Sequence, residues 1–331
     1  MANRVRFAIV GTGMGSDRAR KAANTPGAEL VAVCSLDVAG GQRLATELGC
    51  DFVADYDTLL AREDVDVVGV MTPSGWHCDF AIRALRAGKH AFTTKPMDLR
   101  LEKCDEAIRA AQETGRILAV DFESRYLPVN HQVRQAIRSG RLGKVFSVDL
   151  RMKWYREQSY YDGGTPAGWR SRLETEGGSA ANQAIHYLDL LLWWLGPVQT
   201  VQGRYGTFTH AIETEDNTQA LVTFASGAWG VFQTSTSVFP DLGTAVEIAG
   251  EQGLLAWRDG QVTLFRTKTE EAPALDVHPV DPALPPHIIA DMVAAITQGR
   301  RPMCPAEEGR RSVAFLCALY ESARTGRAIS L

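Results

Sequence analysis

The sequence predicts an α/β protein with two domains: an N-terminal doubly wound parallel sheet, and a C-terminal α+β domain with a large, mostly antiparallel open sheet. Three observations support this fold class. The chain has 331 residues, enough for two domains that each bury a core. Apolar runs of strand length alternate with helical patterns in the first 122 residues. Strands with one apolar face then follow one another in the second part.

The expected strands of the first domain are nearly continuous apolar runs, which are typical of parallel strands covered by helices on both faces. Helical patterns, such as the one around Cys78 to Ala87, separate these runs. The expected strands are Arg6 to Val10, Glu29 to Cys34, Val65 to Met71, His90 to Thr94 and Arg116 to Phe122.

The second part contains strands in which apolar and polar residues alternate. This alternation predicts an antiparallel sheet with one covered face, whose other face needs a cover or a partner. In the first of these strands the apolar positions are Phe146, Val148, Leu150, Met152 and Trp154. The expected strands are Val145 to Tyr155, Thr218 to Phe224, Trp229 to Thr236, Ala245 to Ile248 and Val262 to Phe265.

We place the domain boundary near Glu123, so that residues 1–123 form the first domain and residues 124–331 the second. A helix-like stretch from Ser124 to Gly143 links the two. A C-terminal helix over about 306–325 belongs to the second domain, and we expect it to pack back on the first.

Composition excludes several classes of function. The chain has 35 Lys and Arg against 39 Asp and Glu, and no basic stripe, so nucleic acid is not an expected partner. No export signal or membrane-spanning apolar run is visible, which predicts a cytoplasmic protein without a membrane partner. The six cysteines form no C-x-x-C pair and no Cys/His cluster, so we expect reduced packing residues and no metal.

A glycine-rich turn follows the first expected strand, in G-T-G-M-G-S from Gly11 to Ser16. Glycines at Gly11 and Gly13 permit a tight turn and let a pyrophosphate approach backbone N–H groups at a helix N-terminus. We expect Gly11, Thr12, Gly13 and Met14 to bind a dinucleotide; a turn without a ligand is the alternative. The third small position, needed for helix-to-strand packing, is Ser16, with Gly15 beside it.

The end of the second strand should carry an acid that binds the adenosine ribose of NAD. This chain has Cys34-Ser35-Leu36-Asp37, so Ser35 occupies the expected position and Asp37 lies two residues later. Ser35 would tolerate the 2′-phosphate of NADP, whereas Asp37 would repel it. Both cofactors stay open, with NAD favoured.

Two further strand ends supply polar residues at the carboxyl edge of the sheet, where open α/β sheets bind ligands. We expect Thr72, Ser74, His77 and Lys95 to converge near a nicotinamide. Pro96 restricts the backbone of Lys95 and directs its side chain. An ammonium group in a desolvated pocket can exchange a proton with a reacting hydroxyl. The alternative is a capping turn with a solvated lysine. The neighbouring positions expected to contact the cofactor are Pro73, Thr94 and Pro96.

A buried helix is expected from Gly177 to Pro197, with Asn182 and His186 on one face and Asp189 three residues further on. A histidine in such a helix is either a core residue or a catalyst. The loop from Tyr155 to Arg172 precedes it. Its aromatic residues could stack on a polyol or simply anchor the loop. The expected substrate-binding residues are Tyr155, Trp169, Arg170, Asn182 and His186.

The motifs G-T-G-M-G-S, T-P-S-G-W-H, T-T-K-P and A-N-Q-A-I-H-Y-L-D-L-L together resemble those of the Gfo/Idh/MocA oxidoreductases, the glucose-fructose oxidoreductase and inositol dehydrogenase family. The resemblance covers nearly the whole chain. It implies a Rossmann domain and a C-terminal α/β domain whose open sheet forms a homodimer or homotetramer interface. It also implies hydride transfer between NAD or NADP and a secondary alcohol of a sugar, cyclitol or sugar derivative.

Carried over to this sequence, the family's catalytic lysine falls on Lys95 and its helix histidine on His186, which makes these two residues the candidate acid and base. Three positions depart from the family pattern. Thr94 replaces a glutamate, Ser35 replaces the acid of the second strand, and Asn182 replaces an acid and cannot accept a proton. Two alternatives therefore stay open: a non-catalytic dinucleotide-binding regulator, and an enzyme whose tightly held NAD assists elimination or hydrolysis of a glycosidic bond.

Overall fold

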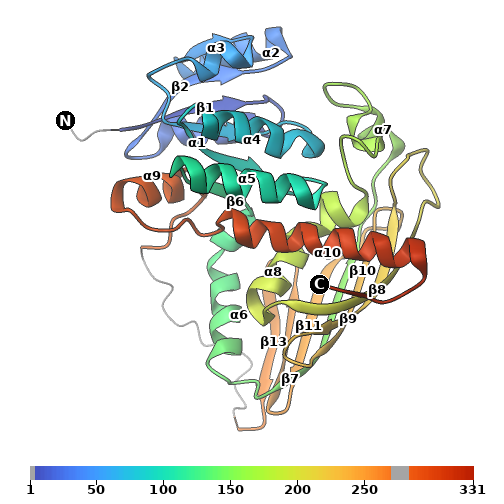
Figure 1. Cartoon of the computed structure of the whole chain (residues 1–331). Coiled ribbons are helices and arrows are strands. Elements are labelled where there is room, and N and C mark those ends of the chain that lie inside the picture. Colours follow the sequence, from blue (N-terminus) through green and yellow to red (C-terminus); the bar gives the residue numbers. More distant parts are fainter. Residues whose placement is uncertain (1–3, 270–282) are drawn as a thin grey trace. The chain divides into compact units, whose positions relative to one another are not determined.

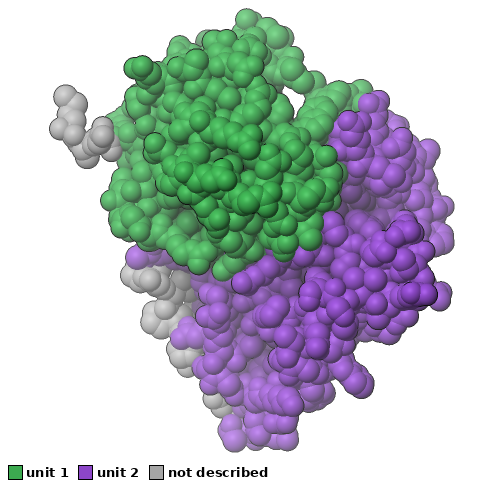
Figure 2. Space-filling view, in the orientation of Figure 1, with its two compact units in different colours: residues 1–123, 163–169, 285–310 green, residues 124–162, 170–284, 311–331 purple. Residues whose placement is uncertain are grey.

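A computed structural model describes residues 4–269 and 283–331 of the chain. They form two compact units (Figure 2). Unit 1 contains residues 1–123, 163–169 and 285–310, and unit 2 contains residues 124–162, 170–284 and 311–331. The chain therefore passes between the units several times, and each unit is described by itself.

Unit 1 is built on a six-stranded parallel sheet with strand order β3-β2-β1-β4-β5-β6 (Figure 1). Strands β1, β4 and β6 are buried on both faces, as their apolar sequences predict, whereas the edge strand β3 is partly exposed. The strands are β1 Val5–Val10, β2 Ala28–Cys34, β3 Asp51–Val53, β4 Val67–Val70, β5 His90–Thr94 and β6 Leu118–Asp121.

The helices of unit 1 connect these strands in the order expected for a doubly wound sheet. Helix α1 packs with α2 and α9, and α4 packs against α5. They are α1 Gly15–Asn24, α2 Val38–Leu48, α3 Tyr56–Leu60, the 3₁₀ turn η1 Ser74–Trp76, α4 His77–Arg86, α5 Leu101–Thr114 and α9 Ile288–Gln298. The 3₁₀ turn η2 Glu123–Tyr126 begins at the unit boundary.

Unit 2 is built on an eight-stranded sheet with strand order β13-β12-β11-β7-β10-β9-β8-β14. All neighbours pair antiparallel except β7 and β10, which are parallel. The strands are β7 Val145–Lys153, β8 Val198–Gly206, β9 Asn217–Phe224, β10 Trp229–Ser235, β11 Gly243–Gly250, β12 Gly253–Arg258, β13 Gln261–Thr267 and β14 Ile329–Ser330.

The helical segments of unit 2 are α6 Pro128–Arg138, α7 Gln158–Asp162, the π-helical turn η4 Ser179–Ala184 and α8 Ile185–Leu195. The 3₁₀ turn η3 Trp169–Ser171 and the long helix α10 Ala306–Thr325 each contribute residues to both units. Helix α8 is buried on almost every side from Leu188 to Trp194, which explains its nearly unbroken apolar sequence.

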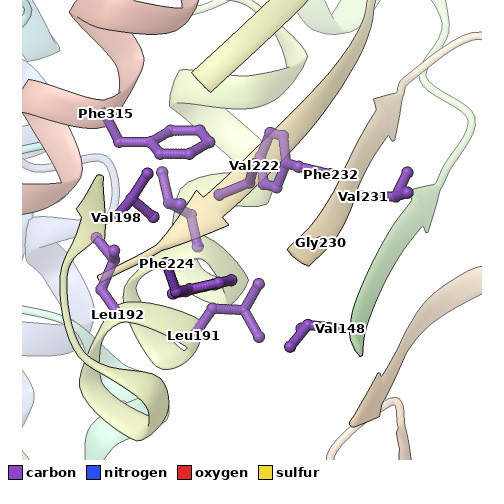
Figure 3. Close-up of a pocket in the computed structure, with 11 residues that line it drawn as sticks. Val148, Leu191, Leu192, Val198, Val222, Phe224, Gly230, Val231, Phe232 and Phe315 are labelled. Carbon is purple, nitrogen blue, oxygen red and sulfur yellow. The ribbon is translucent and has the colours of Figure 1, made fainter. Parts of the chain in front are cut away.

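Figure 3 shows an apolar gap in the core of unit 2. It is lined by Leu188, Leu191 and Leu192 of α8, by Phe315 of α10 and by sheet residues that include Phe224 and Phe232. Its lining contains no charged or polar side chain, so this gap is a packing feature of the core and cannot orient a polar substrate.

The structure confirms the α/β fold class with a parallel and a mostly antiparallel sheet. Strands β3, β8, β12 and β14 are additions that the sequence pattern did not indicate. The expectation for Phe146 was wrong: its side chain is 54% exposed, whereas Val148, Leu150 and Met152 along the same strand are buried.

Candidate functional site

The turn after β1 can be formed only by glycine at its first position. Gly11 has a φ of +93°, and a Cβ atom there would lie 2.4 Å from the carbonyl oxygen of Met71. The backbone N–H of Gly11 donates to the carbonyl of Cys34, 2.7 Å away. The turn is therefore pinned between the ends of β2 and β4.

Gly13 has a different reason for being glycine. It does not have a positive φ, and a Cβ atom there would have no neighbour within 4 Å among the described residues. Neither the backbone nor the packing of the chain requires glycine here. The open space beside Gly13, just before the N-terminus of α1, is what a pyrophosphate group needs in order to approach the backbone. Met14 completes this turn with its side chain 48% exposed.

The close packing of α1 on β1 depends on Gly15, which corrects the expected assignment to Ser16. A Cβ atom at Gly15 would lie 3.2 Å from Cγ2 of Ile9, tighter than ordinary contact. Ser16 instead turns its hydroxyl back to donate to the carbonyl of Thr12.

The candidate ribose site at the end of β2 contains hydroxyl groups. Thr12 Oγ1 and Ser35 Oγ lie 2.9 Å apart, and the Asp37 N–H donates to Ser35 Oγ over 3.1 Å. The carboxylate of Asp37 is exposed and accepts from the N–H of Gly40 at 2.9 Å, which caps α2. Asp37 therefore has a structural role at the helix N-terminus that does not depend on a ribose.

His77 holds two turns of the sheet edge together. Its ring is fully buried, with Nδ1 2.7 Å from the carbonyl oxygen of Pro96 and Nε2 2.7 Å from that of Thr72. The ring could donate hydrogen bonds to both carbonyls at once only if both nitrogens were protonated. Burial opposes this charged form, because it lowers the pKa of His77 to about 4. No carboxylate of residues 4–269 or 283–331 contacts the ring, so we take it as neutral and donating to one carbonyl at a time. His77 thus positions these two turns, and its expected contact with the cofactor stays a prediction.

Lys95 lies at the carboxyl end of β5 and is 9% exposed. The peptide bond to Pro96 is cis. The preceding residue, Thr94, is 6% exposed, and its hydroxyl has no hydrogen-bond partner among the described residues. A buried hydroxyl at the carboxyl end of β5, on the same sheet edge as the glycine-rich turn, is a suitable partner for a polar group of a dinucleotide. Pro73 and Ser74 lie at the end of the neighbouring strand β4, and Ser74 is buried.

Within unit 1, the expected cofactor residues therefore share one edge of the sheet. The strands that carry them, β2, β1, β4 and β5, are neighbours and parallel, so their carboxyl ends coincide. A dinucleotide fits this edge, because the space at Gly13 and the hydroxyl of Thr94 remain available to a ligand.

In unit 2, the expected regular helix from Gly177 begins instead with the π-helical turn η4. Glu215 holds the start of this turn. Its carboxylate accepts from Ser179 Oγ at 2.6 Å and from the N–H of Ala180 at 2.8 Å, and Tyr320 donates to it at 3.1 Å. A Cβ atom at Gly178 would lie 2.1 Å from the Glu215 carbonyl oxygen. The glycine before the helix thus allows the backbone of Glu215, and not a ligand, to approach closely.

The side-chain amide of Asn182 is oriented by three neighbours. Its Nδ2 donates to Glu176 Oε2 at 2.6 Å, which identifies the nitrogen because a carboxylate only accepts. Its Oδ1 accepts from Tyr160 Oη at 3.1 Å and from Gln183 Nε2 at 2.5 Å. Glu176 is 1% exposed, so a buried carboxylate stands directly behind the residue that replaces the family's acid.

Asp189 does not belong to the site, although the expected helix placed it near His186. Its carboxylate is fully buried and pairs with Arg125 through two bonds of 2.7 Å. Such a two-bond pair in the core locks α8 to the start of unit 2. His186 lies in the first turn of α8 and is partly exposed.

The expected loop residues are divided between different surroundings. The ring of Tyr155 packs on Phe239 with centroids 5.2 Å apart, away from the Asn182 network. Trp169 belongs to unit 1 and Arg170 to unit 2, where the Arg170 guanidinium lies 4.7 Å from the ring centroid of Tyr160. Five residues around Asn182 and the start of η4 were not predicted from the sequence: Arg156, Tyr160, Glu176, Gln183 and Glu215. Some of their contacts join residues up to 105 positions apart, and no local sequence motif indicates them.

Over residues 4–269 and 283–331, no group of His, Cys, Asp and Glu side chains is arranged to hold a metal ion. No helix in these ranges is long and apolar enough to cross a membrane.

The substitution His77→Ala should destabilise the protein by about 2–4 kcal/mol, because it removes a buried ring and its hydrogen bond. It should also raise the dissociation constant for NADH by about one order of magnitude, since two turns of the binding edge lose one of the contacts that join them. Urea unfolding and fluorescence titration measure the two effects. His90→Ala is the control: His90 lies at the opposite end of β5 and accepts from the N–H of Ile117. Equal losses of NADH affinity in both variants would contradict the positioning role.

Glu215 should make stability depend on pH. Burial raises the pKa of Glu215 to about 7 from an ordinary value of 4.5, despite hydrogen bonds led by that from Ser179. The folded protein thus binds this proton more tightly, and its contribution to stability, present below about pH 4.5, is lost as the pH rises to about 7. The loss amounts to about 3 kcal/mol at most.

Urea unfolding measures the free energy of unfolding at pH 5 and at pH 8. We expect this free energy to fall less between the two pH values in Glu215→Gln than in the wild type. The exposed neighbour Glu213, whose Oε2 accepts from the N–H of Leu173, provides the control Glu213→Gln, which should keep the wild-type pH dependence. An unchanged pH dependence in Glu215→Gln would disprove the assignment.

Comparison with known proteins gives the same two-part division. Residues 5–122 match the oxidoreductase family with an NAD-binding Rossmann fold, and residues 130–256 match the GFO/IDH/MocA C-terminal domain. A solved structure of the WlbA dehydrogenase from Bordetella pertussis, in complex with NADH and UDP-GlcNAcA, is 30% identical in sequence. It superposes with a TM-score of 0.90, covering 99% of this chain and 98% of that chain.

Two curated relatives show the range of activities around this fold. The 1,5-anhydro-D-fructose reductase of Ensifer adhaerens is 29% identical over 92% of both chains. The 2,7-anhydro-N-acetylneuraminate hydratase of Mediterraneibacter gnavus is 35% identical over 58% of this chain and 50% of its own length, so this chain matches only about half of that relative. Together with the glycine-rich turn and the Lys95-Pro96 strand end, these matches show that the chain belongs to the Gfo/Idh/MocA family of NAD-binding oxidoreductases.

Proposed function

We propose that the protein transfers a hydride between a nicotinamide dinucleotide and a secondary alcohol or ketone of a sugar, cyclitol or sugar derivative. The observation that carries this proposal is the sheet edge of unit 1. There the open space at Gly13 and the buried residues Thr94 and Lys95 lie at the carboxyl ends of β1 and β5, two parallel strands with β4 between them. Relatives named as a reductase and as a dehydrogenase support the same class of reaction.

Lys95 and His186 are the proposed acid and base. The bound nicotinamide supplies the hydride acceptor during oxidation and the hydride donor during reduction. One of the two side chains accepts the hydroxyl proton of the substrate as the alcohol is oxidised, and returns it in the reverse direction. Asn182 cannot take a proton; its oriented amide holds a neighbouring substrate oxygen by hydrogen bonding.

We propose NAD as the cofactor in preference to NADP. Ser35 and Thr12 provide hydroxyl groups at the end of β2, and Asp37 places a carboxylate two residues further on. A 2′-phosphate near Asp37 would meet a like charge, whereas a ribose hydroxyl could donate to an oxygen there. The ratio of NAD to NADP dissociation constants in wild type and Asp37→Asn tests this preference.

A second candidate is supported by the hydratase relative. A tightly held NAD could oxidise a sugar hydroxyl transiently, so that a substituent is eliminated or water is added, and the hydride then returns to the same sugar. In this case cofactor copurifies with the protein and no net NADH accumulates. Net NADH formation with sugars and inositols, followed by absorbance, supports the simple dehydrogenase. Product formation without NADH supports the second candidate, and neither outcome in a cofactor-loaded protein supports a non-catalytic regulator.

Replacing Lys95 by Ala should lower turnover by about 10² to 10⁴, the usual contribution of general acid–base catalysis, with NADH affinity largely retained. Steady-state kinetics and NADH titration measure the two effects. Lys89→Ala is the matched control, because Lys89 lies before the other end of β5 and donates to the carbonyl of Arg62. Near-normal turnover in Lys95→Ala would remove Lys95 from the mechanism.

We also propose that the protein forms a homodimer or homotetramer through the outer face of the eight-stranded sheet. Leu221, Trp229 and Val231 lie on this face and are 62%, 74% and 40% exposed. Leu221 and Val231 are direct cross-strand partners, so their side chains form one apolar patch. Trp229→Lys should lower the mass measured by light scattering to that of the monomer. An unchanged mass would place the interface elsewhere.

A further inference from the structure

Arg156 is a half-buried cation in unit 2 that has no carboxylate partner among the described residues. It follows β7, and its guanidinium lies 4.9 Å from the ring centroid of Trp154 and 5.7 Å from that of Tyr160. No ion pair of the described residues includes Arg156. Other partly buried arginines, such as Arg6 and Arg62, do pair with acids. A partly desolvated charge without a partner is costly, and an incoming anion would offset that cost.

The guanidinium is held in position by the protein. Nη1 donates to the carbonyl of Tyr155 at 2.9 Å, and Nη2 donates to Gln183 Oε1 at 3.4 Å. Stacking on two aromatic rings restricts the plane of the group. Three of its five N–H groups have no partner within the described part of the chain, so a planar donor fork remains available.

Arg156 is connected to Asn182 through a single side chain. Gln183 accepts from Arg156 and donates to both Tyr160 Oη and Asn182 Oδ1, at 2.6 and 2.5 Å. Arg170 lies over the ring of Tyr160 and adds a second positive charge to the same cluster. A ligand that reaches the Asn182 amide can therefore extend to Arg156 without leaving unit 2.

We propose that Arg156 forms an anion-binding subsite beside Asn182, which selects sugar substrates that carry a carboxylate or phosphate group. The guanidinium fork matches the two oxygens of either group. This inference rests on the proposed function only in placing Asn182 in the substrate site. It would make the protein act on acidic or phosphorylated sugars in preference to neutral polyols.

Binding heats test the subsite independently of turnover. The full chain, with and without saturating NADH, is titrated with three matched pairs: D-glucuronate and D-glucose, D-glucose 6-phosphate and D-glucose, UDP-glucuronate and UDP-glucose. Because NADH cannot accept a hydride, the hydroxyl groups are not oxidised during the titration. We expect at least one charged ligand to bind about 10- to 100-fold more tightly than its neutral counterpart, and the preference to fall with added salt. The pair that shows it tells a carboxylate from a phosphate.

Three variants assign the preference to Arg156. Arg156→Gln should reduce it to less than about threefold, and Arg156→Lys should retain part of it, because the charge remains while the fork is lost. Arg151→Gln is the control, since Arg151 is an exposed residue of β7 that pairs with Glu247. It should keep the full preference. Thermal unfolding and NADH affinity verify that Arg156→Gln is folded.

No charged ligand binding more tightly than its neutral partner would overturn the subsite, and so would a preference that survives Arg156→Gln. Failure of the proposed function gives a different result. In that case no sugar reduces NAD in the absorbance assay, while the ratio of charged to neutral affinities is still measured by the binding heats.

Discussion

A buried polar group must find its partner inside the protein, and this requirement organises the candidate site. The ring of His77 lies within hydrogen-bonding distance of backbone carbonyls in two turns, which Cys78 also links through Met97 and Asp98. The carboxylate of Glu215 fastens the first turn of a helix, and that of Glu176 fastens the amide of Asn182. Each of these groups is nearly or completely shielded from water, so losing a partner would cost more than the bond itself contributes.

Close backbone approach is the second constraint, and it acts through glycines. At Gly11 and Gly178 a Cβ atom would collide with a carbonyl oxygen of another segment, and at Gly15 it would press on β1. These positions bring the strand ends and helix starts within hydrogen-bonding range of one another. Gly13 differs, because a Cβ atom there would meet nothing within 4 Å in the described part of the chain. Three of the four glycines thus serve the fold, and one leaves room for a ligand.

The charge pattern distinguishes this chain from the family pattern. Neutral Thr94 and Asn182 stand where acids are expected, yet a buried carboxylate, Glu176, contacts the Asn182 amide directly. Arg156, which forms no ion pair among the described residues, lies over the ring of Tyr160 and would suit an anionic substrate.

The sequence by itself determined the fold class, most strands of both sheets and the strand ends that carry Gly11 and Lys95. Apolar periodicity and the succession of strands and helices along the chain can be read locally. Strands such as β8 and β12 were not predicted, because their sequences do not show a regular alternation of apolar and polar residues. Only the tertiary structure decided the π-helical turn, the inward roles of His77 and Asp189, and the partners of Asn182. Their bonds join residues far apart in the chain, such as Ser179 with Glu215 and Arg125 with Asp189, and no pattern of spacing encodes such a contact.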